Sequence, residues 1–172
     1  MELLDLAIPL ITQIIYLRFL TAAATDVPLV ASGAIMTGRA IAGCLAAGAA
    51  AVQIGTALLL AAEAGTSGPH RRALASSAPT TLTRAFSGRT ARAIVNRFVR
   101  EHDAEAPSAY PDLHHVTSPL RAAGRNADDP EIVNLWAGQA YSLAQQAPTG
   151  EIIASLAADA RQALEHAARR WA

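Results

Sequence analysis

The sequence predicts an α/β protein: a parallel strand–helix–strand unit comes first and a mostly helical C-terminal region follows. Three observations predict it. Two short apolar runs each end in a glycine loop, a stretch of small helix-forming residues separates them, and polar loops alternate with helical patterns after His70. Parallel strands need a crossover connection, usually a helix, so this order is typical of a parallel sheet.

The first strand is predicted at Val27–Ala31, a continuous apolar run that ends at Ser32-Gly33. Such a run is typical of a parallel strand buried on both faces. Thr37 is a candidate N-cap for a helix over residues 38–47. Gly48 then suits a left-handed stop, so the helix should end just before it.

The second strand is predicted at Ala50–Ile54 and ends at Gly55-Thr56. Because parallel strands have their carboxyl ends at one sheet edge, the two glycine loops should meet there, with backbone N–H groups available to an anion. Glycine after a buried strand is also ordinary turn geometry. From these residues alone, a phosphate site and a plain turn both remain open.

The rest of the chain is predicted as helices separated by polar loops. Residues 80–86 suit either a strand or an extended loop, and residues 103–112 a loop. Helices are expected at Arg71–Ser76, at Ala91–Glu101 with its arginines outward, after Pro119, after Pro130, and over a long last segment, Glu151–Trp171.

Composition excludes several classes of function. The 172 residues carry no net charge, so bulk charge does not indicate nucleic-acid binding. All 14 cationic Lys/Arg positions are arginine, which excludes lysine chemistry and leaves arginine or backbone amides to grip a phosphate. The single cysteine, Cys44, is expected to be a buried thiol, and its isolation favours a reducing cytoplasm.

The apolar stretch from Leu6 to Ala24 is interpreted as an amphipathic helix. Gln13 and Arg18 interrupt it, and a charge near the centre of a membrane span is costly. Acids precede it, where a secretory signal has a basic start. We therefore expect neither a membrane span nor a signal peptide.

Several segments resemble the FMN phosphate half of nitronate monooxygenases, the 2-nitropropane dioxygenase family. The resemblance covers about Val27 to the C-terminus. The similar segments are Val27–Ile35, Thr37–Arg39, Gly48–Leu58, Glu63–Ser67 with His70, Thr83–Arg89, Asn96–Phe98 and Leu135–Gln139. Their order and spacing carry the resemblance, since glycine loops alone are shared with other FMN barrels.

The resemblance implies strands seven and eight of a (β/α)8 TIM barrel and FMN as cofactor. It implies that Gly33 and Ala34 donate backbone N–H groups to the phosphate, and that Gln53, Ile54, Gly55 and Thr56 surround it. The family usually has a second glycine where this chain has Ala34. We therefore expect either that Ala34 needs no positive φ or that the site is distorted.

The resemblance divides the chain into three segments: an amphipathic helix and linker (1–26) that match the family poorly, the last barrel βαβ unit with the phosphate loops (27–78), and a mostly helical region (79–172). The family's catalytic histidine belongs to a half that this sequence lacks, so no catalytic residue is assigned. The expected partners are a nitronate substrate with O2, and a complementing N-terminal half or a homo-oligomer, with no nucleic acid and no membrane.

The implied function is that of a truncated, FMN-dependent nitronate monooxygenase, an oxidoreductase that is inactive alone. The enzyme class oxidises alkyl nitronates with O2 to a carbonyl compound and nitrite. Two alternatives stay open: a non-catalytic remnant that self-associates, and an FMN-dependent enoyl-acyl-carrier-protein reductase-like barrel. Glu63 to His70 favours the monooxygenase. Apolar strand faces left without the rest of a barrel predict low solubility.

Other candidate residues have more ordinary interpretations. His70 is expected at the surface or in a cap rather than in catalysis. His114 and His115 with Asp112 lack a further ligand at useful spacing, so no metal site is predicted. Glu63 suits a loop near the cofactor, and Trp136 suits either the mouth of the active site or the core.

Overall fold

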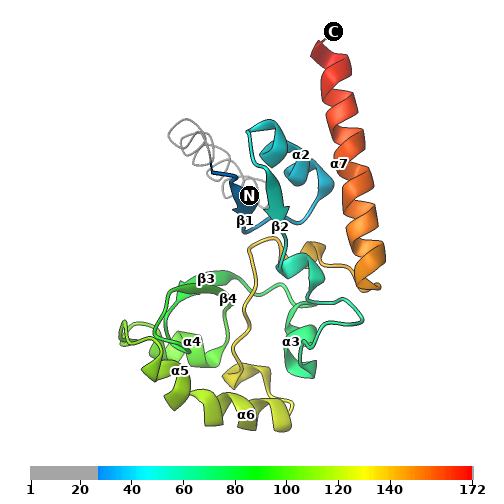
Figure 1. Ribbon diagram of the computed structural model, residues 1–172. Helices are drawn as coiled ribbons and strands as arrows, with labels where there is room; N and C mark the ends of the chain where they lie inside the picture. The colour runs from blue at the N-terminus through cyan, green and yellow to red at the C-terminus, as the bar shows by residue number, and fades with distance from the viewer. Residues whose placement is uncertain (1–26, 172) are drawn as a thin grey trace. The chain divides into compact units, whose positions relative to one another are not determined.

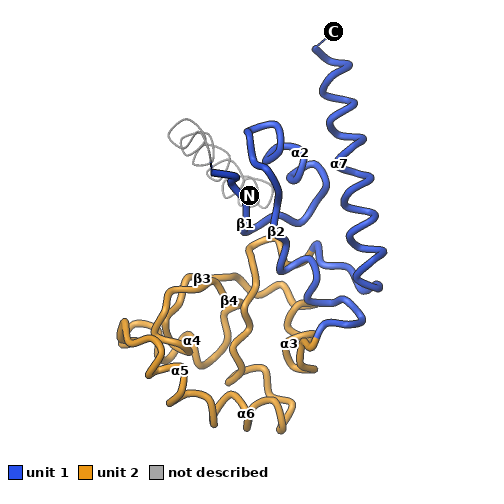
Figure 2. Tube along the Cα trace, in the orientation of Figure 1, with its two compact units in different colours: residues 1–64, 143–172 blue, residues 65–142 orange. Residues whose placement is uncertain are grey.

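The computed structural model describes residues 27–171 (Figure 1). These residues form two compact units (Figure 2): unit 1 comprises residues 27–64 and 143–171, and unit 2 comprises Gly65–Ser142. The amphipathic helix expected in residues 1–26 lies outside the described residues. Within residues 27–171, no helix combines the length and the hydrophobicity that a membrane crossing requires. The three-segment division from the sequence remains a prediction.

Unit 1 contains the predicted strand–helix–strand element. Strand β1 (Val30–Ser32) pairs in parallel with β2 (Ala51–Gln53), and α2 (Gly38–Ala46) connects them. The Thr37 side chain accepts a hydrogen bond from the Ala40 N–H at 3.2 Å, which confirms the predicted N-cap. Gly48 has φ 103°, the left-handed conformation expected after the helix. Local signals therefore define both ends of α2.

The sheet of unit 1 is covered on one face only. Its alternate residues Leu29, Ala31, Val52 and Ile54 pack on a core of small α2 and loop side chains. Their neighbours Val30, Ser32, Ala51 and Gln53 point to the other face and are exposed, Val30 by 56%. The prediction of strands buried on both faces is therefore wrong for the described residues, which cover only one face.

Helix α7 (Thr149–Trp171) packs against α2 at a glycine contact. A Cβ on Gly38 would lie 2.4 Å from the backbone nitrogen of Ala160 and 2.6 Å from the carbonyl oxygen of Leu156. Only glycine allows this approach without displacing α7. At the N-terminal end of α7, Glu63 accepts hydrogen bonds from the Thr149 N–H at 2.9 Å and the Thr149 hydroxyl at 2.8 Å.

Unit 2 combines an antiparallel hairpin with short helices. In β3–β4, Thr80 pairs with Ile94 and Thr83 with Ala91. The 3-10 turn η1 (Thr56–Leu58) belongs to unit 1, and η3 (Tyr141–Leu143) lies where the chain returns to unit 1. The elements of unit 2 are α3 (Gly68–Ala73), β3 (Thr80–Thr83), β4 (Ala91–Ile94), α4 (Arg97–His102), α5 (Asp112–Val116), α6 (Ser118–Asn126) and the 3-10 turn η2 (Pro130–Ile132).

The helix predicted over Ala91–Glu101 is wrong in its first half. Residues 91–94 form β4, and helix α4 starts only at Arg97. The sequence Ala-Arg-Ala-Ile is compatible with a helix as well as with a strand. Residues 91–94 form a strand because they pair with β3. The helix predicted after Pro130 is a single 3-10 turn, η2 (Pro130–Ile132). The C-terminal region is thus not helical throughout, whereas the long last helix is confirmed.

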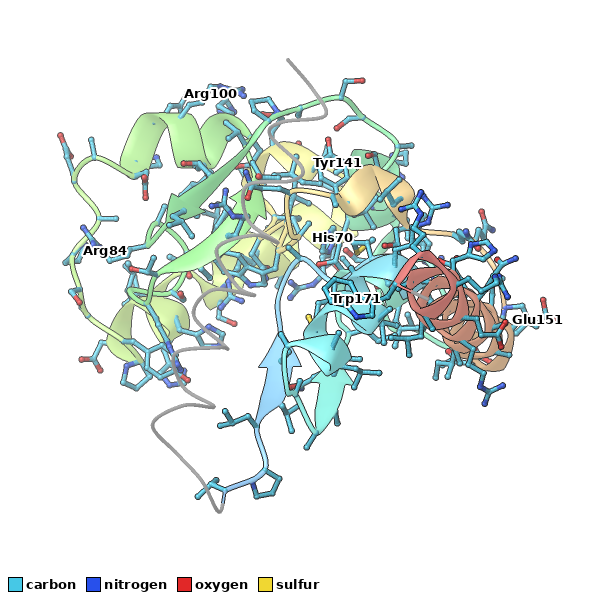
Figure 3. The ribbon with its side chains drawn as sticks, turned by 90° about the horizontal axis from the view of Figure 1, so that it is seen from above. His70, Arg84, Arg100, Tyr141, Glu151 and Trp171 are labelled. Atoms are coloured by element: carbon cyan, nitrogen blue, oxygen red, sulfur yellow. The ribbon has the colours of Figure 1, made fainter. Side chains whose placement is uncertain are left out.

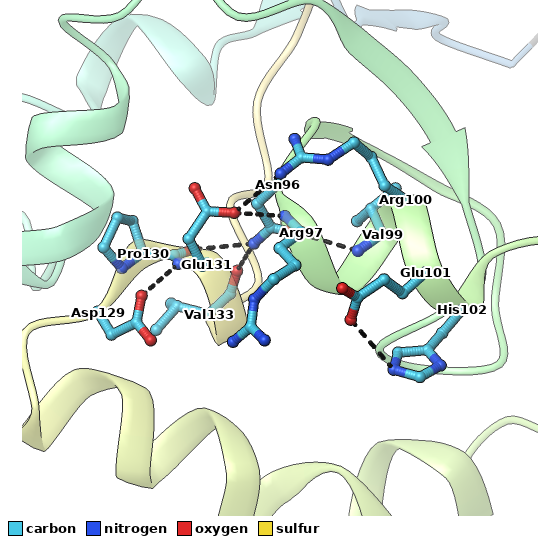
Figure 4. Close-up of polar contacts among 10 residues, drawn as sticks. All are labelled: Asn96, Arg97, Val99, Arg100, Glu101, His102, Asp129, Pro130, Glu131 and Val133. Carbon is cyan, nitrogen blue, oxygen red and sulfur yellow. Dashed lines mark hydrogen bonds and ion pairs between the residues drawn. The ribbon is translucent and has the colours of Figure 1, made fainter.

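Aromatic side chains and one buried amide form the centre of unit 2. Phe86 is fully buried and stacks on Phe98 with ring centroids 4.6 Å apart. The Asn96 amide donates to the carbonyls of Pro130 and Val133, both at 2.8 Å, and its oxygen caps α4 by accepting from the Val99 N–H at 3.1 Å (Figure 4). This side chain joins α4 to the segment around η2.

Candidate cofactor phosphate site

The two predicted loops leave the sheet at the same edge. Ser32 and Gln53 are register partners at the ends of β1 and β2, so the next residues, Gly33 and Ile54, begin from adjacent positions. Neighbouring strands lie about 4.8 Å apart, a separation that one phosphate group can bridge. The structure therefore brings the two sequence-predicted halves of the site together at the carboxyl edge of the strands.

The first loop has two consecutive residues in left-handed conformations. Gly33 has φ 96° and Ala34 has φ 51°. Ala34 therefore has a positive φ, and of the two alternatives expected from the sequence only a distorted site remains. A left-handed residue with a Cβ costs about 1–2 kcal/mol, so this position stores strain that a second glycine would remove. The buried side chains of Ile35 and Met36 anchor the loop immediately afterwards.

The second loop leaves space next to its glycine. Gly55 has φ −126° and ψ −69°, and a Cβ built on it would meet no atom within 4 Å. Turn η1 begins directly afterwards, and the Leu58 N–H donates to the Gly55 carbonyl at 2.9 Å. The open side of Gly55 gives an anion room to approach the backbone.

Side chains at the edge of the sheet divide between the two faces. Ile54 packs against the α2 core, so only its backbone faces the loop region. Gln53 is exposed on the uncovered face, where its amide is able to reach a ligand. Thr56 is half-buried at the start of η1. Of the predicted residues, only Gln53 and Thr56 therefore offer polar side chains.

Backbone donors are available in both loops. Among the loop and turn hydrogen bonds of residues 27–171, none has the N–H of Ala34 or Gly55 as its donor. Clustered backbone N–H groups and open space are the features by which proteins bind phosphate without a basic side chain. The residues present thus fit the phosphate of FMN, which the resemblance implies.

His70 is a buried residue of unit 2 and not a surface or cap residue, so that prediction is wrong. It lies in α3, is only 8% exposed, and its Nε2 has no hydrogen-bond partner within the described part of the chain. Burial lowers the pKa of His70, and a bond to the Trp136 backbone opposes this only in part. The imidazole is therefore neutral at pH 7.

The remaining candidates have structural roles. Hydrogen bonds from Thr149 hold the pKa of Glu63 below its usual range, and this carboxylate caps α7. Trp136 is half-buried and packs edge-on against Phe86, with the ring centroids 6.0 Å apart. His114 Nδ1 lies 3.3 Å from a guanidinium nitrogen of Arg121, a cation that opposes metal binding. Residues 27–171 hold no group of three His, Cys, Asp or Glu side chains able to bind a metal.

The comparison with protein families matches residues 12–159 to the model described as "Nitronate monooxygenase". The match begins earlier than Val27, where the resemblance in the sequence begins. Curated relatives described as "Probable nitronate monooxygenase", from Staphylococcus aureus strains Newman and USA300, are 34% identical over 146 residues. The aligned region is 82% of this chain and 41% of each relative.

Solved structures extend the comparison to the fold. The nitroalkane oxidase from Streptomyces ansochromogenes is 50% identical with a TM-score of 0.85, over 88% of this chain and 44% of that chain. FabK from Thermotoga maritima is 21% identical with a TM-score of 0.76, over 93% of this chain and 52% of that chain, which shows the fold alone. These neighbours are TIM-barrel enzymes, so the described chain has the fold of part of such a barrel.

Proposed function

The chain belongs to the nitronate monooxygenase family, and from this premise we propose that residues 33–34 and 53–56 hold the phosphate of FMN. The observation that carries the proposal is the meeting of the two loops at one sheet edge, beside a glycine whose open side leaves room for an anion. The proposal gives this chain a binding role and assigns it no catalytic residue.

Each residue has a defined part in the proposed site. Gly33 and Ala34 donate backbone N–H groups, and the backbone from Gln53 to Gly55 borders the phosphate from the second strand. Thr56 adds its hydroxyl. Because residues 33–34 and 53–56 include no lysine or arginine, amides and hydroxyls take the role that a cationic side chain has elsewhere. FMN supplies the redox chemistry when it is bound.

The proposed activity of the whole enzyme is oxidation of an alkyl nitronate by O2 to a carbonyl compound and nitrite, in the cytoplasm. The chain spans about two-fifths of the length of the curated relatives it matches. The resemblance assigns the catalytic histidine to a segment outside this chain. We therefore expect weak or no turnover from this chain alone, and activity only with a complementing part of the barrel.

The enoyl reductase alternative has weaker support. The Streptomyces nitroalkane oxidase is 50% identical to this chain, whereas FabK is 21% identical to it. The non-catalytic alternative predicts a different result for flavin binding. An interaction module without a phosphate site would not bind flavin.

The test is an FMN titration of the purified chain and of Gly55→Asp, followed by flavin fluorescence. The added carboxylate would occupy the open space beside Gly55 and repel the phosphate, so we expect affinity to fall at least about tenfold. Gly150→Asp is the matched control, because a Cβ on Gly150 also meets no atom within 4 Å but lies at the start of α7, outside both loops. Equal affinities for the two variants would refute the proposed site.

A further inference from the structure

A groove between α2 and α7 is lined mainly by basic side chains. Its volume is about 480 Å³, and it lies beside the first turn of α2 and the C-terminal half of α7. Figures 1 and 3 both show the two helices side by side, and Figure 3 looks down on the end of α7 at which Trp171 is labelled. We call four of the lining residues the basic cluster: Arg39 from α2, and His166, Arg169 and Arg170 from α7.

The packing of α7 on α2 brings the two sides of the groove together. Gly38 allows the close approach at Ala160, and Arg39 is the next residue of α2. Ala163, Ala167 and Arg170 follow Ala160 along α7 at spacings of three or four residues, so they continue the face that packs on α2. Both of these alanines also line the groove. Their small side chains leave the space that the longer side chains of the basic cluster border.

The basic cluster has no anionic partner among the described residues. All four of its side chains are exposed, and none of the ion pairs within residues 27–171 includes any of them. Two acids of α7, Asp159 and Glu165, are close in sequence, and neither lines the groove. The whole chain has equal numbers of arginines and acids, so the excess of positive charge is a local property of this groove.

The position of Arg39 is unfavourable for a cation that has no anion beside it. Arg39 is the second residue of α2, and the first turn of this helix has no acidic residue. A helix dipole is positive at its N-terminus, so it disfavours a cation there. The dipole of α7 favours Arg169 and Arg170 in its last turn, so these two have a structural explanation that Arg39 lacks. A bound anion would offset the unfavourable position of Arg39.

We propose that this groove binds a small organic phosphate through the basic cluster. Guanidinium groups pair with phosphate in a bidentate geometry. A phosphate group has three acceptor oxygens and up to two negative charges, so it engages several arginines at once, whereas one carboxylate engages one. The groove volume of about 480 Å³ is within the range of sites for small molecules. The ligand class is therefore a phosphate monoester or diphosphate of the size of a metabolite.

The groove is separate from the proposed FMN phosphate site. None of its lining residues belongs to residues 33–34 or 53–56. The residues that α7 contributes also come after residue 159, where the match to the family ends. The inference is therefore a second anion site, and it does not depend on FMN binding at the two loops.

The experiment titrates the full chain, labelled with 15N-arginine, with inorganic pyrophosphate in the absence of FMN, and follows the arginine Nε–H signals by NMR. Arg39→Gln and Arg170→Gln identify two of these signals by their loss. We expect both signals to shift saturably in the unaltered chain. Each substitution should weaken pyrophosphate binding at least about threefold, and the double variant at least about tenfold. Arg161→Gln is the matched control, because it removes the same charge from an exposed position on the opposite side of α7 from Arg170.

Four results would overturn the inference. The first two are the absence of a saturable shift at Arg39 and Arg170, and equal weakening by Arg161→Gln and Arg170→Gln. The third is binding of citrate, which offers only carboxylates, as tightly as pyrophosphate. The fourth is loss of the pyrophosphate shifts in Gly55→Asp but not in Arg39→Gln, which would place the ligand at the two loops. Because FMN is absent, a failed FMN titration would refute the proposed cofactor site and leave this result intact.

Discussion

The two compact units of the chain bury their apolar residues in different ways. Unit 2 surrounds large side chains such as Phe86, Ile94 and Val133 with its own elements. Unit 1 has a core of small side chains, among them Ala40, Cys44 and Ala47, on one face of a two-stranded sheet. No described residue covers the other face of this sheet.

Polar contacts follow the same division. In unit 2, buried or half-buried groups tie distant segments together: Thr83 donates to Asp103 at 2.6 Å, Thr117 to the Phe86 carbonyl at 2.5 Å, and the Tyr141 hydroxyl to the Ala78 carbonyl at 2.7 Å. In unit 1, one exposed carboxylate, that of Glu63, ties α7 to a distant segment. The difference teaches that the proposed cofactor site lies in the unit whose sheet has one face uncovered by the described residues.

The largest effect is expected where unit 1 depends on a single close approach. Gly38→Ala puts a Cβ against the backbone of α7, and overpacking of this kind costs about 3 kcal/mol. Urea unfolding followed by far-UV circular dichroism should show an earlier loss of α7. Gly150→Ala, with open space at its Cβ, is the control. An unchanged midpoint for Gly38→Ala would show that α7 does not pack on α2.

The corresponding change in unit 2 removes its central amide. Asn96→Ala takes away the cap of α4 and leaves the carbonyls of Pro130 and Val133 without this donor, which should cost about 2 kcal/mol. Near-UV circular dichroism of Trp136 during denaturation would report it. Asn126→Ala, at the exposed end of α6, should have little effect. If both variants behave alike, unit 2 does not depend on this network.

A stabilising change is expected at the strained loop of unit 1. Ala34→Gly relieves a left-handed alanine with φ 51° and should raise the stability of unit 1 by about 1 kcal/mol. Thermal unfolding would detect the rise, and FMN affinity should stay the same or increase. A fall in stability would mean that the extra freedom of glycine outweighs the relieved strain.

Mild acid should act on unit 2 before it acts on unit 1. Burial lowers the pKa of His70 in the folded state below the ordinary value of about 6.5. The neutral imidazole of His70 therefore contributes stability above this ordinary pKa, and the contribution is lost as the pH falls through the lower pKa of the folded state. His70→Gln should flatten the pH dependence of unit 2 unfolding between about pH 7 and 5. An unchanged profile would assign this dependence to other histidines.

The smallest effect concerns the cap of α7 in unit 1. The pKa of Glu63 is lowered because the Thr149 backbone N–H and hydroxyl donate to its carboxylate. The cap is thus present above the ordinary pKa of about 4.3 and is lost as the pH falls through the lowered value. Amide exchange in the first turn of α7 should quicken in that range. In Glu63→Gln, the exchange should be insensitive to pH apart from its intrinsic dependence.

The sequence was sufficient where local signals decide the structure. Thr37 and Gly48 bound α2, and the glycines after each apolar run mark the sheet edge that carries the proposed site. It failed where distant residues decide. Strand β4 exists because of β3, and the burial of His70 results from packing within unit 2. The apolar run at Val30 predicted a strand buried on both faces because such a run does not reveal what covers it, and only the resemblance to a barrel pointed to an exposed strand face.

The most direct test of the central claim compares FMN with riboflavin, which lacks the phosphate, in titrations of the chain and of Gly55→Asp. A phosphate site at the β1–β2 edge predicts that the chain binds FMN at least about tenfold more tightly than riboflavin, and that Gly55→Asp removes the difference. Equal binding of the two flavins by the unaltered chain, or a preference for FMN that survives Gly55→Asp, would contradict it.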